Sequence, residues 1–304
     1  PSLGIVMETE AWPKLLRECA AAGVPMLLAN ARLSEKSERG YRSVAPLARE
    51  VFSKFSAIAA QTGADAARLV ALGARPEAIA VTGNVKFDLA AAPAMEDLAA
   101  ALRQRFGRRP VLLAASTREG EEGLLLDALQ SSGGLPAKAL LVMVPRHPQR
   151  FAEVAALFER RSIGYVRRSD EAAVPDGCNY VLGDSLGEMT AYYAACDCAY
   201  VGGSLLPYGG QNLIEACAAG VPVLIGPHTY NFAQAAEAAT AAGAAIRVGD
   251  AAALMSEAGR LLVDTQARER MAQAGRAFCR AHRGATARIL EICENLLAGG
   301  KART

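Results

Sequence analysis

The chain has 304 residues, of which 52% are hydrophobic and 6% aromatic, and its formal net charge at pH 7 is +2. This composition is a poor match for a nucleic-acid-binding protein, which typically has a concentrated basic face. The length predicts about two domains, and no run approaches the roughly 18 apolar residues of a membrane-spanning helix.

Short apolar segments alternate with amphipathic ones, the pattern of a parallel α/β sheet. The first set of predicted strands covers residues 3–7, 25–29, 57–60 and 80–82. The second set covers residues 111–115, 139–144, 164–167, 180–182, 197–201, 222–225 and 244–248. Predicted helices fill the gaps at residues 119–129, 149–161, 186–195 and 232–242, and the chain is helical from residue 252 onward.

These two sets predict two Rossmann-like domains. Residues 1–90 form the C-terminal half of an N-terminal domain, 91–108 a linker, and 109–304 a C-terminal domain with terminal helices. The first set holds about four strands, whereas a doubly wound sheet usually has five or six. The sequence also opens inside a strand, so we expect the front half of the first domain to be absent, in preference to a small natural lobe.

The glycine-rich segment 200–215 is the most informative motif. A strand leads into four glycines, which allow close backbone approach to a ligand, and a helix is predicted to begin at Asn212. A helix N-terminus favours a phosphate, and Glu215 is placed to bind the hydroxyls of a ribose. Asn212 and Glu215 are also spaced as a capping box, an equally good interpretation of the motif alone.

Other polar residues follow predicted strands, where open α/β sheets bind ligands. Arg146 follows one strand and suits a phosphate or a base carbonyl, although a solvated surface turn is the better interpretation of that residue alone. Ser116 and Glu119 are spaced as a structural capping box. Glu8 and Lys86 belong near a cleft between the domains. No Gly-x-Gly-x-x-Gly follows the first strand of either set, which disfavours hydride transfer.

The seven cysteines form no Cys-x-x-Cys pair, and most lie in apolar runs. Free cysteine there behaves as a small hydrophobe. The three histidines are too scattered to indicate a zinc cluster. We therefore expect reduced cysteines, a cytoplasmic environment and no structural metal.

Eight collinear motifs resemble the 3-deoxy-D-manno-octulosonic acid (Kdo) transferase family, enzymes that add Kdo to a lipid A precursor in Gram-negative bacteria. The motifs are residues 7–13 (METEAWP), 29–34 (ANARLS), 81–88 (VTGNVKFD), 144–148 (VPRHP), 183–188 (GDSLGE), 201–204 (VGGS), 209–215 (GGQNLIE) and 226–232 (GPHTYNF).

The resemblance implies a GT-B fold, with two Rossmann-like domains facing across a cleft. It implies inverting transfer from CMP-Kdo to a lipid A precursor (lipid IVA) at the cytoplasmic face of the inner membrane, without a cofactor, a metal or a nucleic-acid partner. Glu8 and Lys86 match positions that stabilise the transition state. The donor contacts match Pro145, Arg146, Leu186, Gly187, Glu188, Asn212, Leu213, Ile214 and Glu215.

The sequence departs from the family pattern in places. Ala11 stands before Trp12 where Leu is usual, and Arg118 stands where His is common, so no role is assigned to Arg118. The family's general-base glutamate and membrane anchor precede the first residue of this sequence. We therefore expect the 304-residue chain to bind CMP but to transfer Kdo negligibly.

Two alternatives remain open. One is a nucleotide-sugar 2-epimerase-like enzyme on the same fold, and the other is a CMP-binding but inactive fragment. The basic segment 32–54 is expected either to face anionic lipid or to be an ordinary solvated helix face.

Overall fold

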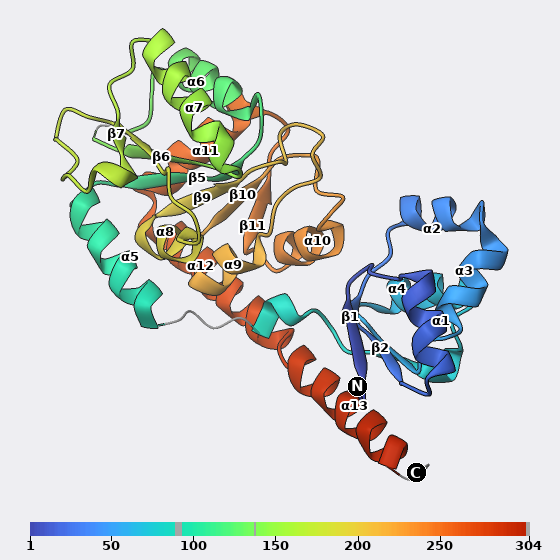
Figure 1. Ribbon diagram of the computed structural model, residues 1–304. Helices are drawn as coiled ribbons and strands as arrows, with labels where there is room; N and C mark the ends of the chain where they lie inside the picture. The colour runs from blue at the N-terminus through green and yellow to red at the C-terminus, as the bar shows by residue number, and fades with distance from the viewer. Residues whose placement is uncertain (89–92, 137, 302–304) are drawn as a thin grey trace. The chain divides into compact units, whose positions relative to one another are not determined.

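The computed structural model describes residues 1–88, 93–136 and 138–301 (Figure 1). The chain divides into two compact units. Unit 1 comprises Pro1–Leu89 and His282–Thr304, and unit 2 comprises Ala90–Ala281.

Unit 1 is built on a four-stranded parallel sheet in the order β1-β2-β3-β4. The strands are β1 (Gly4–Met7), β2 (Met26–Ala31), β3 (Ala57–Ala60) and β4 (Ile79–Val81). The α-helices are α1 (Pro13–Ala21), α2 (Glu35–Arg42), α3 (Ala45–Phe52), α4 (Gly63–Ala71) and α13 (Ala285–Lys301), and two 3₁₀ turns, η1 (Pro76–Ala78) and η2 (Val85–Asp88), flank β4.

The side chains of β2 alternate between the two faces of this sheet, and other elements cover both faces. Leu28 packs in a core with residues of α1, α3 and α4, whereas Leu27 packs against Ile289 and Cys293 of α13. Ile292 and Leu296 extend the apolar stripe of α13 at helical spacing. The predicted domain boundary is therefore wrong for this last helix, which belongs to unit 1.

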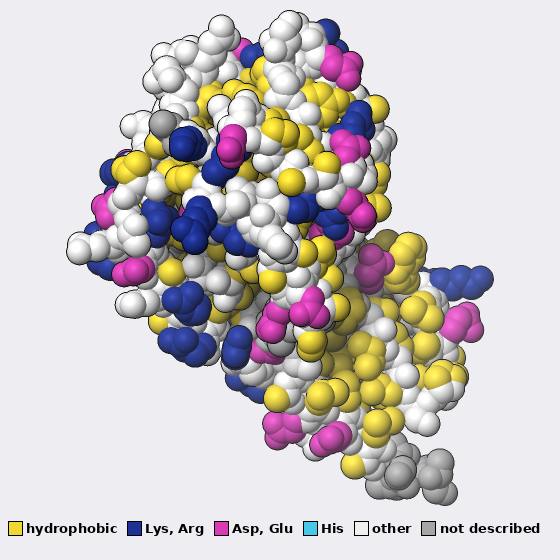
Figure 2. All heavy atoms as spheres, turned by 90° about the vertical axis from the view of Figure 1, so that its left-hand side faces the viewer, with side chains coloured by type: hydrophobic (Ala, Val, Ile, Leu, Met, Phe, Trp, Pro, Cys, Tyr) yellow, Lys and Arg dark blue, Asp and Glu magenta, His cyan; other side chains and the backbone are white. Residues whose placement is uncertain are grey.

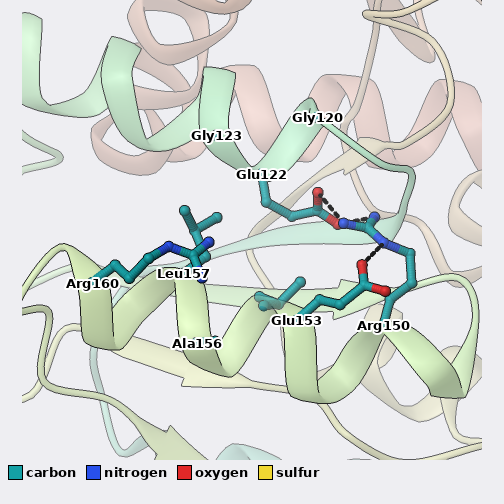
Figure 3. Close-up of a pocket in the computed structure, with 9 residues that line it drawn as sticks. Gly120, Glu122, Gly123, Arg150, Glu153, Ala156, Leu157 and Arg160 are labelled. Atoms are coloured by element: carbon teal, nitrogen blue, oxygen red, sulfur yellow. Dashed lines mark hydrogen bonds and ion pairs between the residues drawn. The ribbon is translucent and has the colours of Figure 1, made fainter.

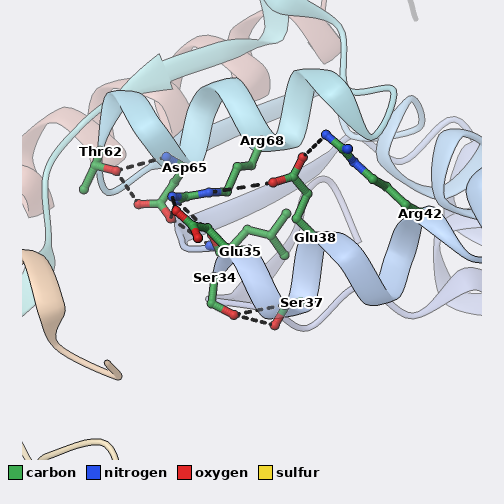
Figure 4. Close-up of polar contacts among 9 residues, drawn as sticks. Ser34, Glu35, Ser37, Glu38, Arg42, Thr62, Asp65 and Arg68 are labelled. Carbon is green, nitrogen blue, oxygen red and sulfur yellow. Dashed lines mark hydrogen bonds and ion pairs between the residues drawn. The ribbon is translucent and has the colours of Figure 1, made fainter. Parts of the chain in front are cut away.

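An arginine-centred network ties α2 to α4 (Figure 4). The Arg68 guanidinium lies 3.4 Å from Glu35, 3.8 Å from Glu38 and 3.8 Å from Asp65. The helix starts are capped by side chains, since the Ser34 hydroxyl accepts from the Ser37 amide at 3.1 Å. Much of segment 32–54 is thus held in internal ion pairs and caps.

Unit 2 is built on a seven-stranded parallel sheet in the order β11-β10-β9-β5-β6-β8-β7. The strands are β5 (Val111–Thr117), β6 (Leu140–Pro145), β7 (Val166–Arg167), β8 (Tyr180–Leu182), β9 (Cys198–Val201), β10 (Val223–Ile225) and β11 (Ala245–Arg247). The α-helices are α5 (Pro93–Phe106), α6 (Glu121–Ser131), α7 (Phe151–Arg160), α8 (Met189–Ala195), α9 (Ile214–Ala219), α10 (Ala233–Ala241), α11 (Ala251–Val263) and α12 (Thr265–Ala281). Short 3₁₀ turns lie at Pro148–Arg150 and Arg168–Asp170.

Helices α6, α7 and α11 lie on one face of this sheet, and α5, α8 and α9 lie on the other (Figure 1). The prediction of a linker at residues 91–108 is wrong over most of that length, because residues 93–106 form α5. The Arg103 guanidinium of α5 donates to the Ala195 carbonyl and the Asp197 carboxylate at 3.3 and 3.2 Å. These bonds fasten α5 to the end of α8 and to the residue before β9.

All eleven predicted strands are present, displaced by at most two residues at either end. The predicted fold class is confirmed: the chain has two α/β units with parallel sheets, in the manner of a GT-B glycosyltransferase. The predicted helix starts are less accurate than the predicted strands. Helix α8 begins at Met189, not Leu186, and α9 begins at Ile214, not Asn212.

The seven cysteines are all free thiols. Among the described residues, no helix combines the length and the apolar character needed to cross a bilayer. On the face that Figure 2 shows, Lys and Arg side chains gather over unit 2, whereas hydrophobic side chains gather over unit 1.

Asp88 anchors the start of α13 in unit 1. Its carboxylate accepts from the amides of Gly284 and Thr286, each at 2.6 Å. Burial raises the pKa of this carboxyl, but the hydrogen bonds from Thr286 and Gly284 outweigh burial, and the pKa is lowered. The carboxylate therefore stabilises the fold at neutral pH, and this contribution is lost as the pH falls through the lowered pKa.

We predict that Asp88→Ala weakens the protection of α13 amides against hydrogen exchange at pH 7 by about 0.5–2 kcal/mol, the usual value of a lost helix cap. The difference from the wild type should shrink as the pH falls through the lowered pKa of Asp88, because protonation removes the carboxylate in the wild type. Asp97→Ala, at an exposed position of α5, is the control. Equal protection of α13 in Asp88→Ala and wild type at pH 7 would contradict this role.

Candidate functional site

The sheet of unit 2 has a topological switch point between β5 and β9. From β5 the chain continues to β6 on one side, and β9 later pairs with the other side of β5. Connections leave the two central strands in opposite directions, and open α/β sheets bind ligands beyond the carboxyl ends of the strands at such a point. The glycine-rich loop, here residues 202–211, follows β9 at this switch point.

Glycine is required where this loop crosses the end of β5. A Cβ atom on Gly202 would lie 2.5 Å from the Ser116 carbonyl oxygen and 2.7 Å from the Thr117 Cα. Both are backbone atoms that cannot move aside. Ser116 itself has a φ of +54°, at an irregularity in the pairing of β5 with β6. The predicted capping box of Ser116 and Glu119 is therefore wrong: α6 begins at Glu121, after Gly120 in the N-cap position.

A buried carboxylate joins the two loops at the switch point. Glu121 is 0% exposed. Its Oε2 accepts from the Gly203 amide at 2.7 Å and the Arg118 amide at 2.9 Å. Its Oε1 accepts from the Tyr200 hydroxyl at 2.6 Å and the Leu205 amide at 3.1 Å. Four donors from β9, the glycine-rich loop and the β5–α6 turn thus converge on one side chain.

The neighbouring Glu122, 1% exposed, has a different role. Its carboxylate accepts from Arg150 at 2.8 and 3.2 Å and from the Thr117 hydroxyl at 2.7 Å. Figure 3 shows this ion pair in a pocket between α6 and α7. Sequence reasoning missed both glutamates, because an acidic run after a strand has the composition of an exposed helix start.

Several amides of the glycine-rich loop donate within unit 2. Gly202 N–H donates to the Ala115 carbonyl, Gly210 N–H to the Gly203 carbonyl at 2.6 Å, and Gln211 N–H to the Gly202 carbonyl at 3.0 Å. With Gly203 bound to Glu121, three of the four glycines use their N–H groups in this way. The amides of these three glycines are therefore engaged within unit 2.

Arg146 lies beyond the end of β6, next to the switch point. Its amide donates to the Thr117 carbonyl at 3.0 Å, and its exposed side chain donates to Gln211 Oε1 at 3.3 Å. Pro145 is the last residue of β6 and is buried. Burial lowers the pKa of the adjacent His147, and the positive charges of Arg118, Arg146 and Arg150 lower it further. The loops after β5 and β6 therefore share a positive field.

Asn212 and Glu215 do contact each other, but not as a capping box. The Asn212 amide nitrogen donates to Glu215 Oε1 at 2.7 Å, and Asn212 Oδ1 accepts from the Ile214 amide at 3.2 Å. Leu213 and Ile214 are buried behind them, and Glu215 is half-buried. Among the described residues no backbone amide donates to the Glu215 carboxylate, so it does not take the role of the capping-box glutamate.

The segment after β8 presents an apolar side chain and a paired carboxylate. Leu186 is 66% exposed, and Gly187 has a φ of +77°. Glu188 accepts from the Arg168 guanidinium at 3.1 and 3.2 Å and from the Ser185 hydroxyl at 2.7 Å. These residues border the carboxyl end of the sheet, two strands from β5.

Unit 1 has its own cluster of charged groups at the carboxyl ends of β1 and β2. Glu8 directly follows β1 with a φ of +56°. Its carboxylate lies 3.6 Å from the Lys86 ammonium and 3.1 Å from the Arg32 guanidinium. The buried Asn30 fixes this geometry, since its Oδ1 accepts from the Val85 amide beside Lys86 at 3.2 Å. The structure therefore brings Glu8 and Lys86 together.

No group of three or more His, Cys, Asp or Glu is placed to hold a metal ion in the part of the chain that the structure describes.

Comparisons with known proteins decide the family. The family model 3-deoxy-D-manno-octulosonic-acid transferase (kdotransferase) matches residues 1–89, and glycosyl transferases group 1 matches residues 164–278. The 3-deoxy-D-manno-octulosonic acid transferase of Bordetella pertussis is 45% identical over 98% of this chain and 70% of its own length. The chain belongs to the Kdo transferase family. The same-named protein of Haemophilus influenzae is 34% identical over the same shares of the two chains.

Kdo transferases are glycosyltransferases, and solved structures agree with this class. The C-terminal CMP-Kdo binding domain of WaaA from Acinetobacter baumannii is 30% identical, with a TM-score of 0.58, and covers 62% of this chain and 98% of that one. Anabaena HepE in complex with UDP is 17% identical, with a TM-score of 0.61 over 97% of this chain and 79% of that chain, and shows the fold alone. A UDP-N-acetylglucosamine 2-epimerase is 16% identical, with a TM-score of 0.55 over 90% of this chain and 66% of that chain. It also shows only the fold, so the epimerase alternative is not favoured.

We predict that Glu121→Gln lowers the free energy of unfolding of unit 2 by about 1–3 kcal/mol, because the new amide nitrogen cannot accept and leaves buried donors unsatisfied. Urea unfolding followed by far-UV circular dichroism measures the change. Trp12, the single tryptophan, lies in unit 1, and its fluorescence is an internal control. Glu119→Gln, at an exposed neighbouring position, should be neutral. An unchanged unfolding midpoint in Glu121→Gln would show that the four hydrogen bonds do not hold the loops.

Proposed function

We propose that this enzyme transfers Kdo from CMP-Kdo to a lipid A precursor with inversion at the anomeric carbon. One observation supports this most strongly. Unit 2 places an arginine, a carboxylate and a glycine-rich loop around its switch point, in a domain related to one described as CMP-Kdo binding. A nucleotide sugar fits a site that combines a cation for its phosphate with a carboxylate for its ribose.

In this proposal the nucleotide lies across the carboxyl ends of β6, β8 and β9. Arg146 binds the phosphate or the cytosine, and Pro145 stiffens the turn beneath it. Glu215, oriented by Asn212, accepts hydrogen bonds from the ribose hydroxyls, while Leu213 and Ile214 form the buried base of this turn. Leu186, Gly187 and Glu188 contact the nucleotide from the loop after β8.

Glu8 and Lys86 act on the sugar. Lys86 orients the Kdo carboxylate, and Glu8 stabilises the positive character that develops at the anomeric carbon as CMP leaves. The acceptor oxygen forms its new bond to the anomeric carbon on the face opposite the leaving phosphate, and its proton passes to a general base. Titration calorimetry of Lys86→Met with CMP-Kdo and with CMP tests the role of the lysine, since a preference for CMP-Kdo equal to that of the wild type would contradict it.

The acceptor and the location are part of the same proposal: a lipid A precursor at the cytoplasmic face of the inner membrane. Segment 32–54 carries Arg39 and Arg42, and Val44 and Leu47 are 46% and 42% exposed beside them. Exposed apolar and basic groups together suit an anionic lipid surface. Figure 4 shows Arg42 beside Glu38, at 2.6 Å, so part of this charge is already paired.

Reversing the charge of both arginines, in Arg39→Glu/Arg42→Glu, should reduce binding to anionic vesicles, because each basic residue near such a surface contributes about 1 kcal/mol. Co-sedimentation with vesicles containing phosphatidylglycerol measures the effect, and neutral phosphatidylcholine vesicles are the control. Unchanged binding to anionic vesicles would identify segment 32–54 as an ordinary solvated surface.

Glu215→Ala should weaken CMP binding by about 1.5–3 kcal/mol, the range for hydrogen bonds to a charged group. Titration calorimetry with CMP on the folded chain measures this, and a thermal melt checks that α9 remains folded. Glu237→Ala, at an exposed position of α10, is a matched control. Wild-type affinity in a normally stable Glu215→Ala protein would leave the carboxylate with only its contact to Asn212.

A further inference from the structure

We propose that the phosphate of the donor nucleotide is held between the guanidinium groups of Arg118 and Arg146, and not by the glycine amides of the loop after β9. This inference rests on the proposed function, since it concerns the donor of that reaction. It assigns a binding role to Arg118, which the sequence left without one.

Three of the four glycine amides in this loop are already engaged. Gly202 and Gly210 donate to backbone carbonyls, and Gly203 donates to Glu121 at 2.7 Å. An N–H group bound to a buried carboxylate is in a charge-assisted hydrogen bond, which is costly to break. Helix α9, with six residues, is too short to supply a strong dipole.

Arg118 lies next to Gly203, and Arg146 contacts Gln211, which also lies next to Gly203. Arg118 follows β5, and its amide shares Glu121 Oε2 with the Gly203 amide. A Cβ atom on Gly203 would lie 3.4 Å from Arg118 Cγ and 3.2 Å from Gln211 Nε2. Gln211 in turn accepts from Arg146 Nε at 3.3 Å. The two arginine side chains therefore border the same small surface at the switch point.

These two cations lack the counter-charge that Arg150 has. Arg150 is 2.8 Å from Glu122 and 3.1 Å from Glu153. Within residues 1–88, 93–136 and 138–301, neither Arg118 nor Arg146 takes part in an ion pair. Arg118 is held instead over the Tyr208 ring, with its Cζ 4.7 Å from the ring centroid. Two neighbouring guanidinium groups without a carboxylate are stabilised by an anion placed between them.

This placement also serves the reaction. When the bond between the anomeric carbon and the phosphate oxygen breaks, its electron pair passes to that oxygen, and the leaving CMP gains negative charge. Guanidinium groups already in position stabilise this charge more in the transition state than in the bound donor.

The test is calorimetric titration of the full chain with CMP and with cytidine, which lacks only the phosphate. The wild type should bind CMP more tightly than cytidine. Arg118→Gln and Arg146→Gln should each weaken CMP binding about 10- to 100-fold, as expected for a charge-assisted hydrogen bond, with cytidine affinity unchanged. Arg118→Lys should restore part of the preference for CMP. Arg160→Gln, which removes an exposed positive charge on α7, should leave both affinities unchanged.

Other outcomes of these titrations distinguish a failure of this inference from a failure of the proposed function. Wild-type CMP affinity in Arg118→Gln would overturn this inference alone. So would an equal loss for CMP and cytidine, which indicates a distorted loop. Loss of affinity for CMP-Kdo but not for CMP would assign Arg118 to the sugar carboxylate and would also overturn it. A wild-type chain that binds cytidine and CMP equally would contradict a phosphate site of any kind, whereas one that binds neither would contradict the proposed function itself.

Discussion

The switch-point site depends on one buried carboxylate without a cationic partner. Glu121 is stabilised by three backbone amides and the Tyr200 hydroxyl, all within 3.1 Å. A carboxylate can remain buried without a counter-charge when its oxygens accept several hydrogen bonds. Because the donors come from two separate loops, the same bonds that stabilise the charge fix those loops against each other.

The adjacent Glu122 shows the other way to stabilise a buried charge. It forms an ion pair with Arg150, which joins α6 to the turn before α7. The two consecutive side chains thus have different roles. Glu121 holds the loops at the switch point together, and Glu122 holds α6 to the turn before α7. Arg150 is neutralised by Glu122 and Glu153. Among the described residues Arg118 and Arg146 form no ion pair, so both side chains can bind an anionic ligand.

The strands could be predicted from the sequence because parallel strands buried on both faces are short apolar runs, and β5 and β6 are clear examples. The ends of the helices could not. Ser116 was expected to cap a helix, but it lies in an irregular strand end, and the chain turns into α6 only at Gly120. Likewise, the place of α13 depends on its apolar stripe meeting β2, a contact between residues about 260 positions apart that no local pattern encodes.

The site was predictable in position but not in chemistry. Strand-end logic selected Arg146, Glu215, Glu8 and Lys86, since that rule depends only on the topology of a parallel sheet. Which groups face a ligand depends on which are used internally, and the glycine-rich loop illustrates this. Its glycines were expected to let a ligand approach the backbone. The structure instead requires Gly202 because a Cβ atom there would lie 2.5 Å from the Ser116 carbonyl oxygen, and it uses the Gly203 amide to hold Glu121. In this loop glycine serves close packing, and recognition of the anion passes to side chains.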